Sequence, residues 1–591
     1  MPTELPSGRY MSCAFALPPD AGGQTRALLM RNRILAREGG VRPELLTLGG
    51  YHDHGERCER LRERGLLLDD MRVRNIFEHY RDHVWSDDAK PVRELEDLSP
   101  DLVREETTPE GAPWRAVYRP DARRRPVYDY LRADGSPFLR MRHYSKAKKW
   151  SWPDSIQRIG PDRTVLGEFD SLGQWFRRWI RELLGDDKRA FVFIDSRFLV
   201  PHLVPMLGPR IHLVYKMHNL HVGPPRRWDS EMHPVYDRVL RRINGMDAMV
   251  TLTQRQRDDI AERRGRTSNM FVVPNPVVMP DPPVPRPERD PARVTIVARL
   301  EKQKRLTDAI AAFQRVLESV PGARLDIYGD GAEREALQAD IDARGLGDSI
   351  VLRGFDPRAA DTLWTSSAFL MTSVYEGYPL STLESMSRGC PVVSYDIKYG
   401  PREQITDGVD GFLVPAGDTE LLARRVVELL SSPELAQRMS AAARARAESF
   451  GPREFLATWA GVLQATVERK PLRTRIEGVR FELTRLEPVS PLIRLLGRRA
   501  LRLEAVVEID GRGGGTGWDA VDFALAWVDV DTGAVTALPL RARRSKRRFR
   551  LRATIDPPAG NAWLRLRLTW ANSAWQTEVA RVRRGRLKRS A

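Results

Sequence analysis

The chain has 591 residues, 41% of them hydrophobic and 30% charged, so its composition is that of a globular protein. At about 150 residues per domain, this length suggests three or four domains. No apolar run approaches the roughly 20 residues of a membrane-spanning helix, and Met1–Gly8 lacks the apolar core of a signal peptide. Cys13, Cys58 and Cys390 stand apart without CxxC spacing. This argues against disulfides and a zinc site, and it favours a reducing, cytoplasmic location.

The charge is unevenly distributed. The net charge is +17, and residues 471–591 alone hold 25 lysines and arginines against 12 aspartates and glutamates. The positive charge is densest at Arg541–Arg550 and Arg581–Arg589. Such a field attracts polyanions such as nucleic acid, anionic lipid or a phosphate-rich polymer. A solvated basic face in an arginine-rich chain is the simpler alternative.

The chain opens with the unit that begins nucleotide-binding α/β folds. A short apolar run, Tyr10–Leu17, predicts a buried strand, and Gly22 and Gly23 lie in the turn that follows it. Apolar residues then recur at helical spacing over Thr25–Arg37. Strand, glycine turn and helix together predict a Rossmann-like first domain.

The rest of the chain divides by pattern. Short aromatic-rich stretches predict a β-rich insertion before strand–helix alternation resumes at Phe191. The proline-rich stretch Pro280–Pro291 predicts a linker to a second α/β domain, with a parallel sheet and a long helix over Asp418–Ala447. Alternating strands beyond Lys470 predict a β-sandwich-like module. The expected domains are 1–285, with the insertion at about 50–185, then 286–465 and 471–591.

Two cations follow the first strand of the second α/β domain. Arg299 and Lys304 lie five residues apart on a loop at the carboxyl end of that strand, where open α/β sheets bind ligands. A guanidinium offers a planar fork to phosphate oxygens, and an ammonium adds a point charge. Together they could neutralise a diphosphate, although basic residues on a loop are more often merely solvated.

A turn and a helix start carry two glutamates. After an apolar strand, a Gly-Tyr-Pro turn opens a helix, with Pro379 acceptable in the first turn. The free N–H groups near Leu380 and Ser381 would face an anion. Glu384, one turn further on, can accept two ribose hydroxyls, and Glu376 can reach a sugar. By chance alone they would be a surface glutamate and a helix-capping acid.

The phrase Ser373–Met386 resembles the Glu-x7-Glu motif of family-four retaining glycosyltransferases. That family has the GT-B fold, which is α/β with two Rossmann-like domains facing a cleft. The similarity covers residues 190–460 well and 8–50 more loosely. Other matching phrases follow in the same order: Gly22-Gly23, Val273–Val277, Arg299 with Lys304, Ile327–Gly331 and Arg353–Phe355.

The resemblance implies roles for particular residues. Gly22 and Gly23 match the donor loop of the first domain, and Arg353 matches the strand end near the nucleobase. His218 matches a histidine that packs beside the donor sugar, so His218 and Glu376 are the expected catalytic residues. The nearby His221 is expected to be structural.

A narrower resemblance concerns the branch of the family. Ser394–Glu403 is similar to the poly(glycerol-phosphate) and poly(ribitol-phosphate) glycosyltransferases of wall teichoic acid, and to protein-serine N-acetylglucosaminyltransferases of accessory secretion systems. That branch also carries a β-rich insertion. Leu566–Thr577 resembles β modules attached to teichoic-acid-type enzymes.

The resemblance implies a retaining transfer of glucose or N-acetylglucosamine from a UDP-sugar to a hydroxyl. In the family, the leaving phosphate helps to deprotonate the acceptor on the same face of the sugar. The growing phosphate charge would be met by Arg299, Lys304 and the amides near Leu380 and Ser381. The donor loops of the second domain hold no Asp-x-Asp motif, so neither a metal nor another cofactor is expected.

Several partners stay open. A polyol-phosphate polymer is the expected acceptor, and a protein serine is the alternative. The basic tail also suits an anionic membrane face, such as the inner face of the plasma membrane, and the β insertion could mediate homo-oligomers. A catalytically degenerate transferase that acts as a binding partner is a further hypothesis. Nucleic-acid binding is disfavoured, because Trp563, Trp570 and Trp575 are spaced like β-core residues and no RNA-binding signature accompanies them.

Overall fold

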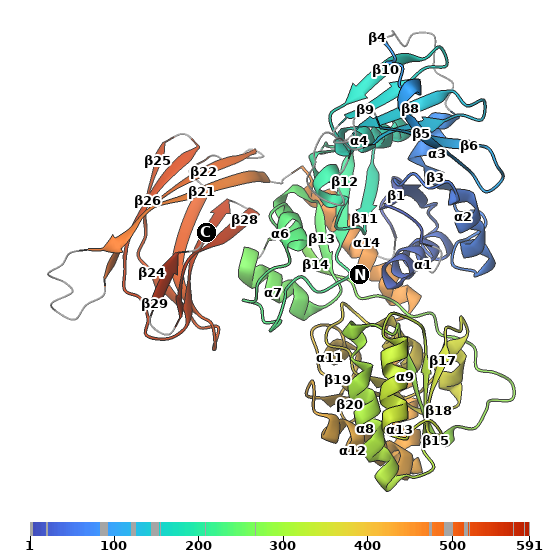
Figure 1. Cartoon of the computed structure of the whole chain (residues 1–591). Coiled ribbons are helices and arrows are strands. Elements are labelled where there is room, and N and C mark those ends of the chain that lie inside the picture. Colours follow the sequence, from blue (N-terminus) through green and yellow to red (C-terminus); the bar gives the residue numbers. More distant parts are fainter. Residues whose placement is uncertain are drawn as a thin grey trace.

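Seven parallel strands form the sheet of the first α/β domain, in the order β14-β13-β12-β11-β1-β2-β3 (Figure 1). Strand β11, Ala-Phe-Val-Phe-Ile, is buried throughout, as expected for a strand covered on both faces. The strands are β1 (Arg9–Ala14), β2 (Glu44–Thr47), β3 (Val73–Asn75), β11 (Ala190–Ile194), β12 (Ile211–Lys216), β13 (Ala248–Thr251) and β14 (Met270–Val272).

The computed structural model describes residues 4–18, 22–82, 93–119, 126–142, 153, 155–206, 208–265, 267–471, 475–489, 500–512, 518, 521–545, 547–570, 573–583 and 586–589. Within these ranges, none of the helices combines the length and hydrophobicity of a membrane-spanning segment.

Helices cover both faces of the first sheet. Helix α1 begins at Gly23, directly after the glycine turn, and buries Leu28, Leu29 and Leu35. The helices are α1 (Gly23–Arg37), α2 (His54–Glu63), α3 (Ile76–Arg81), α4 (Leu172–Leu184), α5 (Val200–Leu203), α6 (Pro234–Leu240) and α7 (Gln254–Arg264).

The aromatic-rich stretch forms a separate antiparallel sheet, at the top of the molecule in Figure 1. The pattern predicted β structure from about residue 50, whereas residues 54–81 form two helices and strand β3 of the parallel sheet. Trp175 and Trp179 of α4 are fully buried beneath it. Its strands, in the order β4-β10-β9-β8-β7-β6-β5, are β4 (Arg93–Glu94), β5 (Leu102–Thr107), β6 (Pro113–Tyr118), β7 (Val127–Leu131), β8 (Pro137–Arg142), β9 (Ser155–Ile159) and β10 (Thr164–Phe169).

The second α/β domain has a six-stranded parallel sheet in the order β17-β16-β15-β18-β19-β20. Its strands are β15 (Asp290–Val297), β16 (Arg324–Tyr328), β17 (Ile350–Gly354), β18 (Ser366–Met371), β19 (Val392–Tyr395) and β20 (Gly411–Val414). Its helices are α8 (Leu306–Ser319), α9 (Arg334–Ala343), α10 (Leu380–Ser387), α11 (Pro401–Gln404), α12 (Thr419–Ser431) and α13 (Pro433–Glu448).

The helix expected over Asp418–Ala447 is two helices, α12 and α13. Pro433 cannot donate to the turn before it, so α12 ends, and Ser432 caps α13 by accepting a hydrogen bond from the N–H of Leu435. The next helix, α14 (Pro452–Arg469), returns to the first domain, where Trp459 packs edge-on against Phe193 with ring centroids 5.3 Å apart. The chain therefore crosses between the two α/β domains twice.

The C-terminal module consists of two antiparallel sheets with a common core. Alternation in β26 buries every second side chain, as a two-layer β fold requires. One sheet, β21-β22-β26-β25, holds β21 (Arg475–Pro488), β22 (Leu501–Arg512), β25 (Arg541–Ser545) and β26 (Arg548–Ile555). The other, β24-β23-β27-β28-β29, holds β23 (Val521–Asp529), β24 (Val535–Leu538), β27 (Ala562–Trp570), β28 (Ser573–Arg583) and β29 (Arg586–Arg589).

The module lies against helix α7 of the first domain (Figure 1). The backbone carbonyl of Glu262 accepts hydrogen bonds from Arg565 and Gln576, both of which are buried. Trp563 packs on Trp228 of the first domain with ring centroids 4.9 Å apart. The basic C-terminal part of the chain is thus docked on the first domain.

Candidate active site

The carboxyl ends of the two parallel sheets meet between the α/β domains. Gly377 follows β18, and a Cβ atom placed on it would lie 1.9 Å from the carbonyl oxygen of His218, which follows β12. Only glycine allows the two backbones to approach this closely. On α7, the carboxylate of Asp259 accepts from Lys398 Nζ at 2.5 Å and from the Tyr399 hydroxyl at 2.6 Å, both after β19. Residues on both edges can therefore act on one ligand.

Lys304 and Glu376 lie together. Lys304 Nζ contacts Glu376 Oε1 at 2.6 Å, and the Ser373 hydroxyl donates to the same oxygen at 2.8 Å. Lys304 ends a 3₁₀ turn after β15, and Glu376 lies on the loop after β18. Because β15 and β18 are adjacent strands, the sheet brings together residues that are 72 positions apart. Lys304, which was predicted to bind phosphate, and Glu376, which was predicted to bind the sugar, thus neutralise each other.

Arg299 is exposed, and its guanidinium has no hydrogen-bond or ion-pair partner among the described residues. The Gly-Asp-Gly turn packs against its loop. A Cβ atom on Gly329 would lie 1.8 Å from the carbonyl oxygen of Ala298, and one on Gly331 would lie 2.5 Å from that of Leu300. Both glycines have positive φ. The motif therefore fixes the loop that carries Arg299 while its side chain stays available to an anion.

Helix α10 begins where the motif predicted. Leu380 and Ser381 are its first two residues, Pro379 precedes it, and no side chain caps its N-terminus. The first N–H groups of the helix therefore have no acceptor within it. Glu384 pairs across the domains with Arg26 of α1 at 2.5 Å. A ribose that bound Glu384 would have to share it with Arg26 or displace it.

The other residues predicted to bind the donor substrate lie apart from the ion pair of Lys304 and Glu376. Arg353, at the end of β17, pairs with Asp326 at 2.7 Å, and the exposed ring of Phe355 follows it. A Cβ atom on Gly22 or Gly23 would meet nothing within 4 Å. Packing among the described residues therefore does not require glycine at these two positions.

His218 belongs to a buried network that sequence reasoning missed. Its Nε2 atom lies 2.8 Å from Asp195 Oδ1, and Arg31 contacts both oxygens of Asp195 at 2.9 and 2.8 Å. Asp195 directly follows β11, so a carboxylate at a strand end was a readable signal. Arg31 gave no such signal, because an arginine inside an amphipathic helix normally faces solvent, whereas this one is 0% exposed.

Electrostatics fix the state of His218. Burial opposes charge on Asp195, but Arg31 and His218 outweigh it and hold the pKa of Asp195 well below its usual range. Burial lowers the pKa of His218, despite its hydrogen bond to Asp195. The imidazole is therefore neutral at pH 7. A carboxylate can only accept, so Nε2 of His218 carries the proton and Nδ1 is left as an acceptor.

Lys216 and His221 flank this histidine. Lys216 donates to the Asn275 side chain at 3.0 Å, and burial, aided by Arg31, lowers the pKa of Lys216 to about 7. His221 is 0% exposed and stacks on Tyr399 with ring centroids 6.1 Å apart, and among the described residues neither of its nitrogens has a hydrogen-bond partner. His221 therefore fills an apolar contact between the domains.

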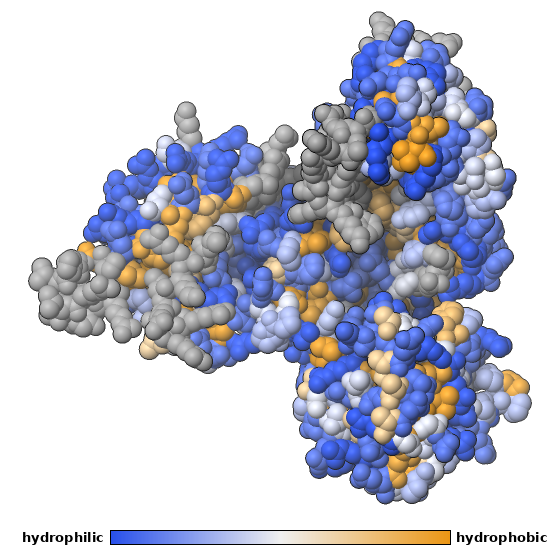
Figure 2. All heavy atoms as spheres, viewed as in Figure 1, coloured by the Kyte–Doolittle hydropathy of each residue, from blue (hydrophilic) through white to orange (hydrophobic). Residues whose placement is uncertain are grey.

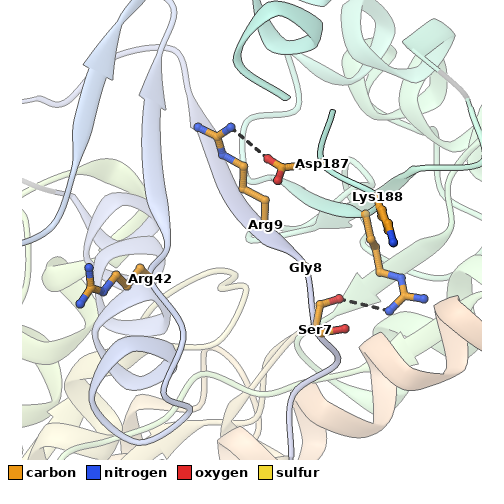
Figure 3. Close-up of a pocket in the computed structure, with 7 residues that line it drawn as sticks. Ser7, Gly8, Arg9, Arg42, Asp187 and Lys188 are labelled. Atoms are coloured by element: carbon orange, nitrogen blue, oxygen red, sulfur yellow. Dashed lines mark hydrogen bonds and ion pairs between the residues drawn. The ribbon is translucent and has the colours of Figure 1, made fainter. Parts of the chain in front are cut away.

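A pocket of about 540 Å³ lies at the opposite edge of the first sheet (Figure 3). Ser7 and Arg9 at the start of β1, Arg42 before β2 and Asp187 before β11 contribute to its lining. Arg9 pairs with Asp187 at 3.2 Å and with Glu44 at 2.6 Å. The pocket is thus separate from the carboxyl edge that carries the candidate site.

Comparison with known proteins identifies the second domain. Residues 281–446 match the family described as glycosyl transferases group 1. The chain is 28% identical over 306 residues to a poly(glycerol-phosphate) alpha-glucosyltransferase of Bacillus subtilis, covering 51% of this chain and 44% of that protein. It is 25% identical over 289 residues to a poly(ribitol-phosphate) alpha-N-acetylglucosaminyltransferase of Staphylococcus aureus, covering 48% of this chain and 56% of that protein. The chain spans about half the length of these two curated relatives.

Two solved structures share the fold. TarM superposes with a TM-score of 0.60 at 18% identity, covering 78% of this chain and 99% of TarM. The pneumococcal O-GlcNAc transferase GtfA, in complex with UDP and GlcNAc, superposes with a TM-score of 0.56 at 17% identity, covering 78% of this chain and all of GtfA. Residues 281–446 thus carry the match to the group 1 glycosyl transferases, in a chain with the GT-B fold.

Proposed function

We propose that the chain is a retaining glycosyltransferase that moves a hexose, glucose or N-acetylglucosamine, from a UDP-sugar to a hydroxyl of a poly(polyol-phosphate). One observation supports this most. Two cations and a carboxylate, Arg299, Lys304 and Glu376, lie on neighbouring loops of the second domain, opposite the neutral His218 of the first. A nucleotide diphosphate sugar needs such cations at its phosphates and hydrogen-bonding groups at its hexose.

The ion pair between Lys304 and Glu376 suggests how the donor enters. A diphosphate beside Arg299 would draw Lys304 towards its oxygens, which frees Glu376 for the sugar hydroxyls. As the glycosidic bond breaks, the negative charge that grows on the β-phosphate is met by Arg299, Lys304 and the first N–H groups of α10. The leaving phosphate accepts the proton of the acceptor hydroxyl. We propose that these cations need no metal ion beside them.

His218 would contact the sugar from the other domain. Its Nδ1 atom can accept a hydrogen bond from a sugar hydroxyl, because Asp195 holds the proton on Nε2. Arg31 and Asp195 act through His218 and are positioning residues. Gly377 lets the two domains approach at this point, which excludes water from the reacting atoms.

The acceptor follows from the relatives. The two curated relatives act on poly(glycerol-phosphate) and poly(ribitol-phosphate), and the basic C-terminal module suits such a polymer. The likeness to GtfA, named as an O-GlcNAc transferase, favours a protein serine as the second candidate. A degenerate transferase that only binds a partner is a weaker candidate, since the charged site residues are all present.

We further propose a cytoplasmic enzyme, for which contact of the basic surface with the inner face of the plasma membrane is the alternative to polymer binding. Homo-oligomers would form through the insertion sheet. Strand β5 is an edge strand of that sheet, and it exposes Leu102 by 45% and Val103 by 57%. An edge strand with exposed apolar side chains is a ready contact surface.

The test is turnover of Lys304→Ala and Glu376→Ala with UDP-glucose and with UDP-N-acetylglucosamine. Loss of one charge-assisted contact in the transition state should lower kcat/KM by about 30- to 1000-fold, or about 2–4 kcal/mol. Lys302→Ala is the matched control, because Lys302 is exposed on the same 3₁₀ turn. If both site variants turn over like the wild type, the assignment is wrong.

A further inference from the structure

Four arginines of the C-terminal module form a double row on neighbouring strands. On the edge strand β25, Arg541 and Arg543 are exposed, and on β26 so are Arg548 and Arg550. In the antiparallel register Arg543 lies directly opposite Arg550, and Arg541 lies opposite a further arginine, Arg552. We call Arg541, Arg543, Arg548 and Arg550 the arginine ladder.

Opposed arginines work against the fold. Residues directly opposite on antiparallel strands have Cβ atoms about 5 Å apart, and like charges there are destabilising. Among the described residues, no carboxylate forms an ion pair with any arginine of the ladder. Glu508 of β22 lies opposite Arg548 in register, so one carboxylate borders the ladder. Arg541, Arg543 and Arg550 have no carboxylate opposite them among the described residues.

The other half of the same sheet is built differently. Arg480 of β21 faces Glu508 of β22 in register and contacts it at 3.2 Å. Arg485 faces Glu504 in register and contacts Glu487 at 2.9 Å. Charge on β21 and β22 is thus balanced by pairing. On β26, Arg552 pairs with Glu504 of β22 at 3.4 Å, whereas the four arginines of the ladder form no ion pair among the described residues.

The ladder is open to a long ligand. The sheet order ends at β25, so no further strand covers its outer side. Docking to the first domain uses Arg565 of β27 and Gln576 of β28 in the other sheet, and strand β21, which lies at the edge of this sheet opposite β25. Hydrophilic side chains dominate the outer end of the module in Figure 2, where Figure 1 places β25.

The spacing suits a linear polyanion. Alternate residues of a strand lie about 6.6 Å apart on one face, and neighbouring strands lie about 4.8 Å apart. Phosphates spaced by a short polyol can each lie between two guanidiniums of such a double row. A membrane surface is the weaker fit, because membrane binding also needs exposed apolar side chains. In the described part of the module, Val535 is the one large hydrophobic side chain that is exposed.

We propose that the arginine ladder binds a linear phosphodiester polymer. Many weak contacts along the polymer would hold its hydroxyls near the enzyme and raise their local concentration. That this polymer is also the glycosyl acceptor rests on the proposed function, whereas the binding itself does not.

The experiment compares two double variants of the full chain. Arg543→Gln with Arg550→Gln removes one opposed pair of the ladder, and Arg480→Gln with Arg485→Gln removes the same charge from the neutralised half. Deleting the module would be less informative, because it would also uncover the Glu262 end of α7. The probes are long-chain inorganic polyphosphate, orthophosphate at equal total phosphate, and phosphatidylglycerol vesicles.

We expect the ladder variant to bind polyphosphate about tenfold more weakly than the wild type, and its salt slope to fall by about 1.4. The control variant should bind polyphosphate like the wild type. Orthophosphate should bind neither to the ladder variant nor to the control variant. Equal weakening in both variants would mean that only net charge matters, which overturns the proposal. Loss of vesicle binding with polyphosphate binding intact would overturn it in favour of a membrane surface.

Hydrolysis of UDP-sugar without acceptor separates this inference from the proposed function. The ladder variant should hydrolyse the donor at the wild-type rate, because the ladder does not touch the donor site. Normal hydrolysis with unchanged polyphosphate binding would refute the ladder alone. If the wild-type chain binds polyphosphate through the ladder but neither hydrolyses nor transfers either sugar, the proposed function fails and the ladder stands.

Discussion

The buried network of Arg31, Asp195 and His218 allows a sharp test of positioning. Asp195→Asn keeps the size of the side chain but removes its charge. An amide presents one oxygen and one NH₂ group, so it cannot accept all three of the hydrogen bonds that the carboxylate receives, two from Arg31 and one from His218. In at least one of these contacts, the NH₂ group of the asparagine would therefore face another N–H donor.

The magnitude follows from burial. The side chains of Arg31 and Asp195 are each 1% exposed, so removing one partner leaves a buried charge uncompensated. Such a change costs about 3–5 kcal/mol of folding free energy. With the amide NH₂ group turned towards His218, the imidazole loses the acceptor that fixes its proton on Nε2. Misplacement of a group at the reacting centre by about 1 Å lowers the rate by about 100-fold.

Two readouts separate structure from catalysis. In the double variant, Arg31→Met with Asp195→Asn, no unpaired charge remains, so the thermal midpoint should recover most of the loss while kcat stays low. The assay is differential scanning fluorimetry beside UDP-sugar turnover at saturating donor. If turnover recovers together with stability, Asp195 only supports the fold, and its role in orienting His218 is refuted.

Two further predictions concern the junction between the domains. Burial lowers the pKa of His221 from 6.5 to about 3, so the unfolded chain takes up this proton below pH 6.5 while the folded chain does not. Acid therefore favours unfolding, and His221→Phe should remove about 2 kcal/mol of the stability lost between pH 7.5 and pH 5. An identical fall of the thermal midpoint in both proteins would contradict this. Gly377→Ala should abolish transfer while UDP still binds the second domain by calorimetry, because the added Cβ atom would lie 1.9 Å from the carbonyl oxygen of His218. Gly347→Ala, where a Cβ atom meets nothing within 4 Å, is the control, and full turnover of the Gly377 variant would argue against close approach of the domains.

Local pattern was enough for the sheets and for the donor loops. Strand–helix alternation predicted two parallel sheets, and ligand loops follow the carboxyl ends of parallel strands, so Arg299, Lys304 and Glu376 could be placed from sequence. The break at Pro433 was also readable, since proline ends a helix that precedes it. The roles of these residues towards a donor stay predictions.

Which residue types follow which strands could be predicted from local pattern, because a strand end and a helix start are local events. The partner of each charged side chain is known only from the folded chain. In the folded chain, Lys304 forms an ion pair with Glu376, Arg26 with Glu384 and Arg31 with Asp195. Folding also paired Arg480 with Glu508 and left the four arginines of the ladder without an ion pair among the described residues, because cross-strand register depends on pairing between segments distant in the chain. Burial and strand register depend on contacts between segments that are distant in the chain, so they cannot be predicted from a short stretch of sequence.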